Sequence, residues 1–187
     1  MVWQGIWPAA DQFDRLPSKP MFEVTDDSGF LALVVPGAYE SFVANDWSLD
    51  QILAHFRVQM ARHALLIWGT GREGTWNVEA ALNKSKAKGF REVNGPIHVV
   101  GGAVLLANYE SLTMAAQFKN ITLPEKHQEH LLMSLPDGDY ACRIIQMFDP
   151  ERAESAGNNR SDFVVELQRV TNRIGAWESI PWFKVDR

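Results

Sequence analysis

The chain has 187 residues and a formal net charge of −5, from 18 Lys and Arg against 23 Asp and Glu. A hydrophobic fraction of 46% and a charged fraction of 22% are ordinary for one globular domain and exclude a disordered or low-complexity chain. The acidic balance, without large Lys and Arg clusters, argues against a nucleic-acid binder and suits attraction to a basic partner.

The first predicted elements along the chain are a buried strand and a helix. Residues 30–35 form a short apolar run bounded by Gly29 and Pro36, which is typical of a strand. A long amphipathic helix is predicted from about 49 to 63, with Ser48 as N-cap and Gln51 completing a capping box. Apolar residues recur there at helical spacing and make one face: Leu49, Ile52, Leu53, Phe56 and Met60.

The rest of the sequence predicts mostly strands, at 64–68, 75–79, 97–100, 103–107, 140–148 and 163–170. The glycine-rich turn from Gly69 to Gly74 and the Gly101-Gly102 dipeptide predict tight hairpins, with Trp68 and Trp76 facing each other across the first. Short strands at this spacing predict a mainly β (α+β) fold, a two-sheet β-sandwich with the helix packed over an end or a face.

A possible internal repeat suggests that the single domain, residues 1–187, contains two duplicated halves, about 20–90 and 91–187. Tyr39-Glu-Ser-Phe42 follows one apolar run, and Tyr109-Glu-Ser-Leu112 follows another seventy residues later. Duplication of a half-domain would explain this arrangement. A chance likeness of four residues is the alternative.

The turn from Gly69 to Gly74 also matches G-x-G-x-x-G, the glycine pattern of dinucleotide-binding folds. That interpretation needs a helix starting within the motif, because the helix N-terminus would hold the pyrophosphate. The residues that follow, Thr75-Trp-Asn-Val78, favour a strand instead. We therefore expect a turn between strands and no cofactor.

His127 and His130 resemble half of a metal site. Zinc needs three or four protein ligands, and no second ligand cluster stands elsewhere in the sequence, so we expect no metal. Catalytic triads are recognised by geometry, which a sequence does not give. No catalytic residue is therefore assigned, and we expect a protein that is not an enzyme.

The expected compartment is the cytoplasm. Residues 1–8 lack the basic and long apolar segments of a signal peptide, and no stretch approaches the ~20 apolar residues that span a bilayer. The one cysteine, Cys142, stands in an apolar stretch and is expected to be a buried thiol without a disulfide.

Six residues are candidates for binding a protein partner. Asp26, Asp27, Asp137 and Asp139 lie at predicted turns, where side chains are exposed and local turn chemistry is their alternative role. Trp177 and Trp182 lie close to one chain end and either pack it down or anchor an interface.

Leu135-Pro-Asp-Gly-Asp-Tyr140, continuing into an apolar strand and the turn at Asp149-Pro150, resembles the ComJ-like bacterial nuclease inhibitors and small acidic toxin-immunity proteins. The resemblance covers about a quarter of the chain, and the helix and the long first half depart from it. It implies an immunity-type inhibitor that neutralises a basic toxin or nuclease, and no binding residue carries over. An enzyme with an unrecognised small-molecule site and a structural or assembly subunit are the alternatives.

Overall fold

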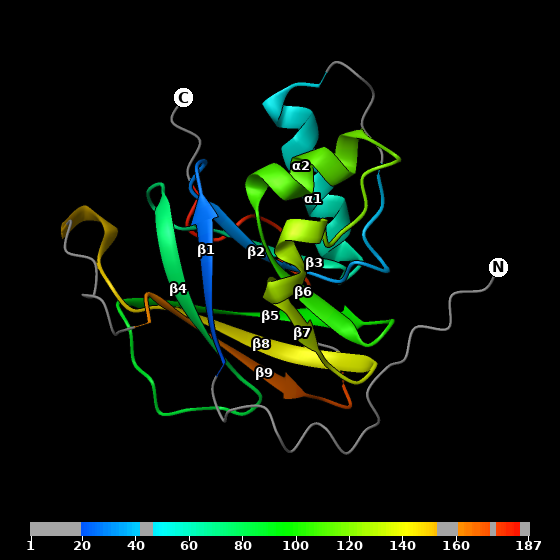
Figure 1. Ribbon diagram of the computed structural model, residues 1–187. Helices are drawn as coiled ribbons and strands as arrows, with labels where there is room; N and C mark the ends of the chain where they lie inside the picture. Colours follow the sequence, from blue (N-terminus) through cyan, green and yellow to red (C-terminus); the bar gives the residue numbers. More distant parts are fainter. Residues whose placement is uncertain (1–19, 42–46, 153–160, 173–174, 184–187) are drawn as a thin grey trace.

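The computed structural model describes residues 20–41, 47–152, 161–172 and 175–183 (Figure 1), so residues 1–8, discussed above, lie outside it. The strands are β1 Met21–Asp26, β2 Phe30–Val34, β3 Leu65–Gly69, β4 Gly74–Ala81, β5 Arg91–Val99, β6 Ala103–Asn108, β7 Leu132–Ser134, β8 Gly138–Gln146 and β9 Phe163–Arg169. The helices are α1 Leu49–Ala61, α2 Tyr109–Gln117 and the 3-10 helices η2 Lys126–Leu131 and η3 Pro150–Arg152.

Two β-sheets pack face to face, as the sequence predicts. One sheet has five strands in the order β1-β4-β9-β8-β5, and the other has four in the order β3-β2-β6-β7. Neighbouring strands are antiparallel except β4 and β9, which run parallel. Apolar side chains from both sheets make one core between them.

The chain crosses from one sheet to the other at each of four short links. These links, which we call arches, are residues 27–29, 70–73, 100–102 and 135–137. The hairpins predicted at residues 69–74 and at Gly101-Gly102 are wrong. The strands on either side of each of these links belong to different sheets, so they face each other across the core and pair with other strands.

Trp68 and Trp76 illustrate the consequence of these crossings. They lie in different sheets and form no cross-strand pair. Their rings instead meet Phe163 of β9, at centroid distances of 6.3 and 5.6 Å respectively. The two tryptophans therefore belong to the core between the sheets.

The helices form a third layer. Strands β2 and β3 are buried along their whole length, because α1 and α2 cover the outer face of the four-stranded sheet (Figure 1). Strand β4 instead alternates buried and part-exposed residues, as a strand with one solvated face does. The outer face of the five-stranded sheet is thus the more polar one.

The predicted helix is confirmed as α1. The Ser48 hydroxyl accepts a hydrogen bond from the Gln51 N–H, and the Gln51 side chain accepts one from the Ser48 N–H, which completes the capping box. Helix α2 was not predicted, although Asn108 caps it through the Ser111 N–H. No helix in the described ranges is long and apolar enough to cross a membrane.

Candidate functional site

A hollow of about 990 Å³ opens at one end of the sandwich. Its walls are the arches 27–29 and 70–73 and the C-terminal residues 181–183, and we call it the arch hollow. Its lining includes Ser28, Arg72, Glu73, Arg91, Glu151 and Trp182. Backbone hydrogen bonds join the walls, from the Thr70 N–H to the Gly29 carbonyl at 2.8 Å and from the Gly69 N–H to the Pro181 carbonyl at 2.9 Å.

The first arginine of the hollow, Arg72, lies against aromatic rings. Its guanidinium carbon is 5.5 Å from the ring centroid of Trp76 and 5.4 Å from that of Phe148. Its Nε is buried and has no hydrogen-bond partner among the described residues. Stacking on a ring face leaves the N–H edge of a guanidinium able to donate.

The second arginine, Arg91 of β5, is arranged in the same way. Its guanidinium carbon lies 4.6 Å from the ring centroid of Trp182, and its Nε donates to Gln146 Oε1 at 2.6 Å. Burial lowers the pKa of Arg91, and the nearby charge of Asp149 partly offsets this. Its Nη2 is buried without a hydrogen-bond partner in the described part of the chain.

Behind Ser28, two carboxylates lie close together. The Ser28 hydroxyl donates to Glu110 Oε1 at 2.5 Å, and the Ser28 N–H donates to Asp26 Oδ1 at 3.2 Å. Asp26 is fully buried, and this burial raises its pKa to about 6 although backbone N–H groups of residues 28–30 stabilise the charged form. The expectation that Asp26 is exposed is therefore wrong, because its carboxylate holds the first arch from inside.

The other predicted acidic residues do not gather around Asp26. Asp27 is exposed beside Ser28, whereas Asp137 is exposed in the arch 135–137 and accepts a hydrogen bond from the Gly102 N–H at 2.7 Å. Because β2 and β6 are antiparallel neighbours, the arches 27–29 and 100–102 that precede them lie at opposite ends of the four-stranded sheet. The arch 135–137 lies beside 100–102, to which the hydrogen bond from Gly102 joins it. One acidic surface made of both pairs is therefore absent.

Asp139 has a structural partner. It lies opposite His98 in the ladder of β5 and β8, and His98 Nδ1 is 2.6 Å from Asp139 Oδ1. The two side chains form a polar cross-strand pair on the outer face of the five-stranded sheet. A role of Asp139 in binding a partner stays a prediction.

Trp177 and Trp182 both pack against the domain. The Trp177 ring lies over Gly95, and its Nε1–H donates to the Asn94 carbonyl at 2.6 Å. Trp182 lies on Arg91 in the wall of the arch hollow. Residues 175–183 thus run along β5 and β3, the edge strands on one side of the sandwich. Packing against the domain is therefore one role of both tryptophans.

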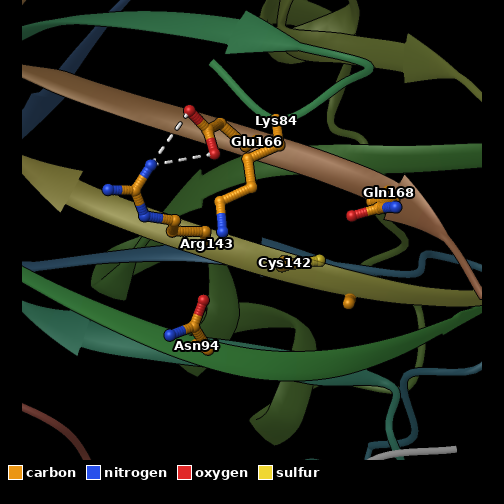
Figure 2. Close-up of a pocket in the computed structure, with 7 residues that line it drawn as sticks. Lys84, Asn94, Cys142, Arg143, Glu166 and Gln168 are labelled. Carbon is orange, nitrogen blue, oxygen red and sulfur yellow. Dashed lines mark hydrogen bonds and ion pairs between the residues drawn. The ribbon is translucent and has the colours of Figure 1, made fainter. Parts of the chain in front are cut away.

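A second, smaller pocket of about 90 Å³ lies on the outer face of the five-stranded sheet. Figure 2 shows Arg143 and Glu166 joined across it, with an Nη1 to Oε2 distance of 3.2 Å. The Ser85 N–H and hydroxyl also donate to Glu166 Oε1, at 2.9 and 2.5 Å. Although burial raises the pKa of Glu166, these bonds keep it below its usual range, so the Glu166 carboxylate that lines the pocket is already paired.

Cys142 and the histidine pair show no constellation for catalysis. Cys142 is buried, and burial raises the pKa of its thiol, which disfavours the nucleophilic thiolate. His127 and His130 are exposed on η2. Within the described residues, no group of three or more His, Cys, Asp or Glu side chains is placed to hold a metal ion.

Comparison with known proteins gives a likeness of fold. The sequence matches no model of a known protein family and no curated protein. The structure is similar to ComJ from Bacillus subtilis, an inhibitor of the DNA degrading activity of NucA, with a TM-score of 0.50 and 13% identity over 81% of this chain and 96% of ComJ. It also matches crocagin biosynthetic gene J, with a TM-score of 0.46 and 11% identity over 81% of this chain and 96% of that one.

Proposed function

We propose that this protein is a protein-binding inhibitor of the immunity type, which neutralises a basic partner such as a toxin or nuclease. The observation that carries the proposal is the likeness of fold to ComJ over 96% of that inhibitor's length. The net charge of −5 supports it, because an acidic protein attracts a basic partner over several ångströms before contact.

The arch hollow offers a contact surface for such a partner. Glu73 and Glu151 line the hollow with exposed side chains, and Asp27 is exposed on the adjoining arch. We call these three residues the acidic rim. Exposed charges of this kind steer a partner to the surface, whereas buried aromatic and arginine side chains hold it there. Trp182 and Arg91 lie inside the same rim.

The direct test is co-expression with the product of the neighbouring gene, followed by purification at low salt and an assay of that product's toxic or nuclease activity. We expect a complex and loss of the partner's activity. A partner that neither co-purifies nor loses activity contradicts the inhibitor function.

The contact surface is tested with two variants that each remove two charges. Asp27→Asn with Glu73→Gln should slow association on the order of fivefold at low salt, and the loss should shrink as salt screens the charges. Asp137→Asn with Glu178→Gln is the matched control, with the same change in net charge at two residues that do not line the hollow. Slower association in the control alone would move the contact to the arch of Asp137 and Asp139.

A further inference from the structure

Two buried guanidinium donors in the arch hollow lack an acceptor in the described part of the chain. They are Arg72 Nε and Arg91 Nη2. An unsatisfied donor in the interior is costly, and more so where the group is charged, so folded proteins rarely leave one without a partner. These two nitrogens have almost no accessible surface, so a group bound in the hollow would meet the remaining N–H groups of the same two side chains, which line it.

The glycine-rich arch lies beside Arg91. A Cβ atom added to Gly71 would lie 3.5 Å from Arg91 Nη2, so this nitrogen lies beside the residue that precedes Arg72. The same Cβ atom would lie 2.7 Å from the Pro150 ring, and Gly71 has a φ of 89°, so only glycine fits. The motif therefore places the Gly71 backbone against the Arg91 guanidinium, one residue before Arg72.

We propose that the arch hollow is a binding site for a carboxylate group, held by Arg72 and Arg91 together. Guanidinium groups present N–H donors in a plane that matches the two oxygens of a carboxylate. Stacking against Trp76 and Trp182 fixes both arginine planes before a ligand arrives, so less side-chain entropy is lost on binding.

The charge around the hollow favours a carboxylate over a phosphate. Two arginines face two glutamates, Glu73 and Glu151, in the lining, while Asp149 acts on Arg91 and Asp162 acts on Arg72 from nearby. The four carboxylates outnumber the two arginines. A phosphate with nearly two negative charges therefore meets more net repulsion from the whole set than a group with one negative charge.

The carboxylate has two candidate sources, a free small acid and an acidic side chain of a protein partner. The hollow of about 990 Å³ has room for either one. The second source rests on the proposed function, whereas binding of a free acid does not. Two probes separate them: succinate for the free acid, and acetyl-Gly-Glu-Gly-amide for a side chain presented on a peptide.

The test is a titration of the full chain followed by NMR of the arginine Nε–Hε and tryptophan Nε1–H signals. We expect the signals of Arg72 and Trp182 to shift and saturate with one or both probes, with a Kd on the order of 1 mM for groups this small. Arg72→Gln should weaken binding at least tenfold. Arg57→Gln is the matched control, because Arg57 is exposed on α1, and it should leave the affinity unchanged.

Inorganic phosphate serves as the competing anion. Phosphate that binds more tightly than both probes overturns the choice of a carboxylate, and shifts that never saturate overturn the site. If Arg72→Gln unfolds the protein, Arg72→Lys keeps the charge but lacks the planar set of donors, and equal affinity in that variant also overturns the site. Failure of the inhibitor assay leaves these outcomes unaffected, because they need no partner.

Discussion

The segments 21–81 and 91–146 have the same pairing pattern and a different chemistry. Strand β1 pairs with β4 so that Asp26 lies opposite Gly74, and β5 pairs with β8 so that Val99 lies opposite Gly138. The first glycine stands where β4 begins and the second where β8 begins. The two ladders therefore correspond residue by residue.

The correspondence extends to the four-stranded sheet and to the arches. Phe30 lies opposite Gly69 between β2 and β3, as Ala103 lies opposite Ser134 between β6 and β7. In each half a backbone N–H of the second arch donates to a glycine carbonyl of the first, from Thr70 to Gly29 and from Leu135 to Gly102. We propose that the halves arose by duplication, which the common register supports. The test is to align the two halves with each other in related sequences, and we expect them to be weakly similar.

The two ends nevertheless differ in what they expose. The arches of the first half surround the hollow with Arg72, whereas those of the second half are closed by the hydrogen bond from Gly102 to Asp137. A buried aspartate, Asp26, stands in the first half where the second has the buried Val99. The two halves thus share their strand pairing and differ in the side chains around their arches.

The largest effect is expected from separating the halves. Strand β4 pairs with β9 and β2 pairs with β6, so each half leaves a central sheet edge unpaired without the other. Fragments 20–90 and 91–187 should each be unfolded alone, losing the whole stability of about 5–15 kcal/mol. Chemical-shift dispersion in NMR spectra of the fragments checks this. A fragment that folds by itself would show separable domains instead of one.

A second prediction replaces a residue of the second half with its counterpart from the first. Gly95 of β5 corresponds to Phe22 of β1, and a Cβ atom at Gly95 would lie 2.5 Å from the Trp177 ring and 2.8 Å from Leu66. Gly95→Phe should therefore destabilise the fold by about 3 kcal/mol in denaturant unfolding.

Two controls accompany that substitution. Gly175→Ala should change stability by less than about 0.5 kcal/mol, because no atom lies within 4 Å of the added Cβ. Gly95→Phe should also cost less in a Trp177→Ala background, where the clashing ring is absent. Equal costs in both backgrounds would show that Trp177 does not occupy the space over Gly95.

The pH dependence of stability should come partly from the first half. The pKa of Asp26 is raised from 3.8 to about 6, so the folded state binds this proton more tightly than the unfolded chain does. The contribution to stability is complete below pH 3.8 and is lost as pH rises through about 6. Val99, its counterpart, does not titrate.

Asp26→Asn tests this assignment, because asparagine keeps an oxygen for the Ser28 N–H and carries no charge. We expect the variant to be more stable than the wild type by about 1–2 kcal/mol at pH 8 and nearly equal to it at pH 4. Melting temperatures across this range measure the difference. An advantage that is the same at both pH values would place the titration elsewhere.

The smallest effects concern the helix caps of the two halves. Asn108 accepts from the Ser111 N–H and also donates from Nδ2 to the Thr25 carbonyl at 2.9 Å, so it joins α2 to β1. Asn108→Ala should cost about 2 kcal/mol, and Ser48→Ala, which only caps α1, about 1 kcal/mol. Denaturation midpoints should keep this order, and the reverse order would contradict the link to β1.

Sequence patterns predicted the fold at the points where local signals are strong. Ser48 and Gln51 mark the start of α1 through short-range hydrogen bonds, and a capping box needs no distant partner. Helix α2 was not predicted, because nine residues give only a short periodic pattern and an N-cap residue such as Asn108 does not by itself indicate a helix. The repeated tetrapeptides at Tyr39 and Tyr109 do not occupy equivalent positions in the two halves. Tyr39 follows the end of β2 after a gap, whereas Tyr109 follows β6 directly and begins α2.

The candidate site was less accessible to prediction. Glycines from Gly69 to Gly74 identify a turn, but Arg72 and Arg91 line one hollow only because β4 and β5 belong to one sheet and residues 181–183 close the same end. Asp26 and Asp27 look alike in sequence, yet one is buried and the other exposed. Burial at a strand end depends on what packs over it.

The class of the fold follows from short-range patterns, because strand and helix periodicities, caps and glycine turns act over a few residues. Whether each glycine turn pairs its two strands or separates them into two sheets depends on long-range packing. Glycines with positive φ are compatible with a hairpin turn and with an arch alike, and Gly29 and Gly102 stand in arches. The choice is made by long-range burial, since the apolar faces of both sheets leave water only when the strands on either side of each arch face each other across the core.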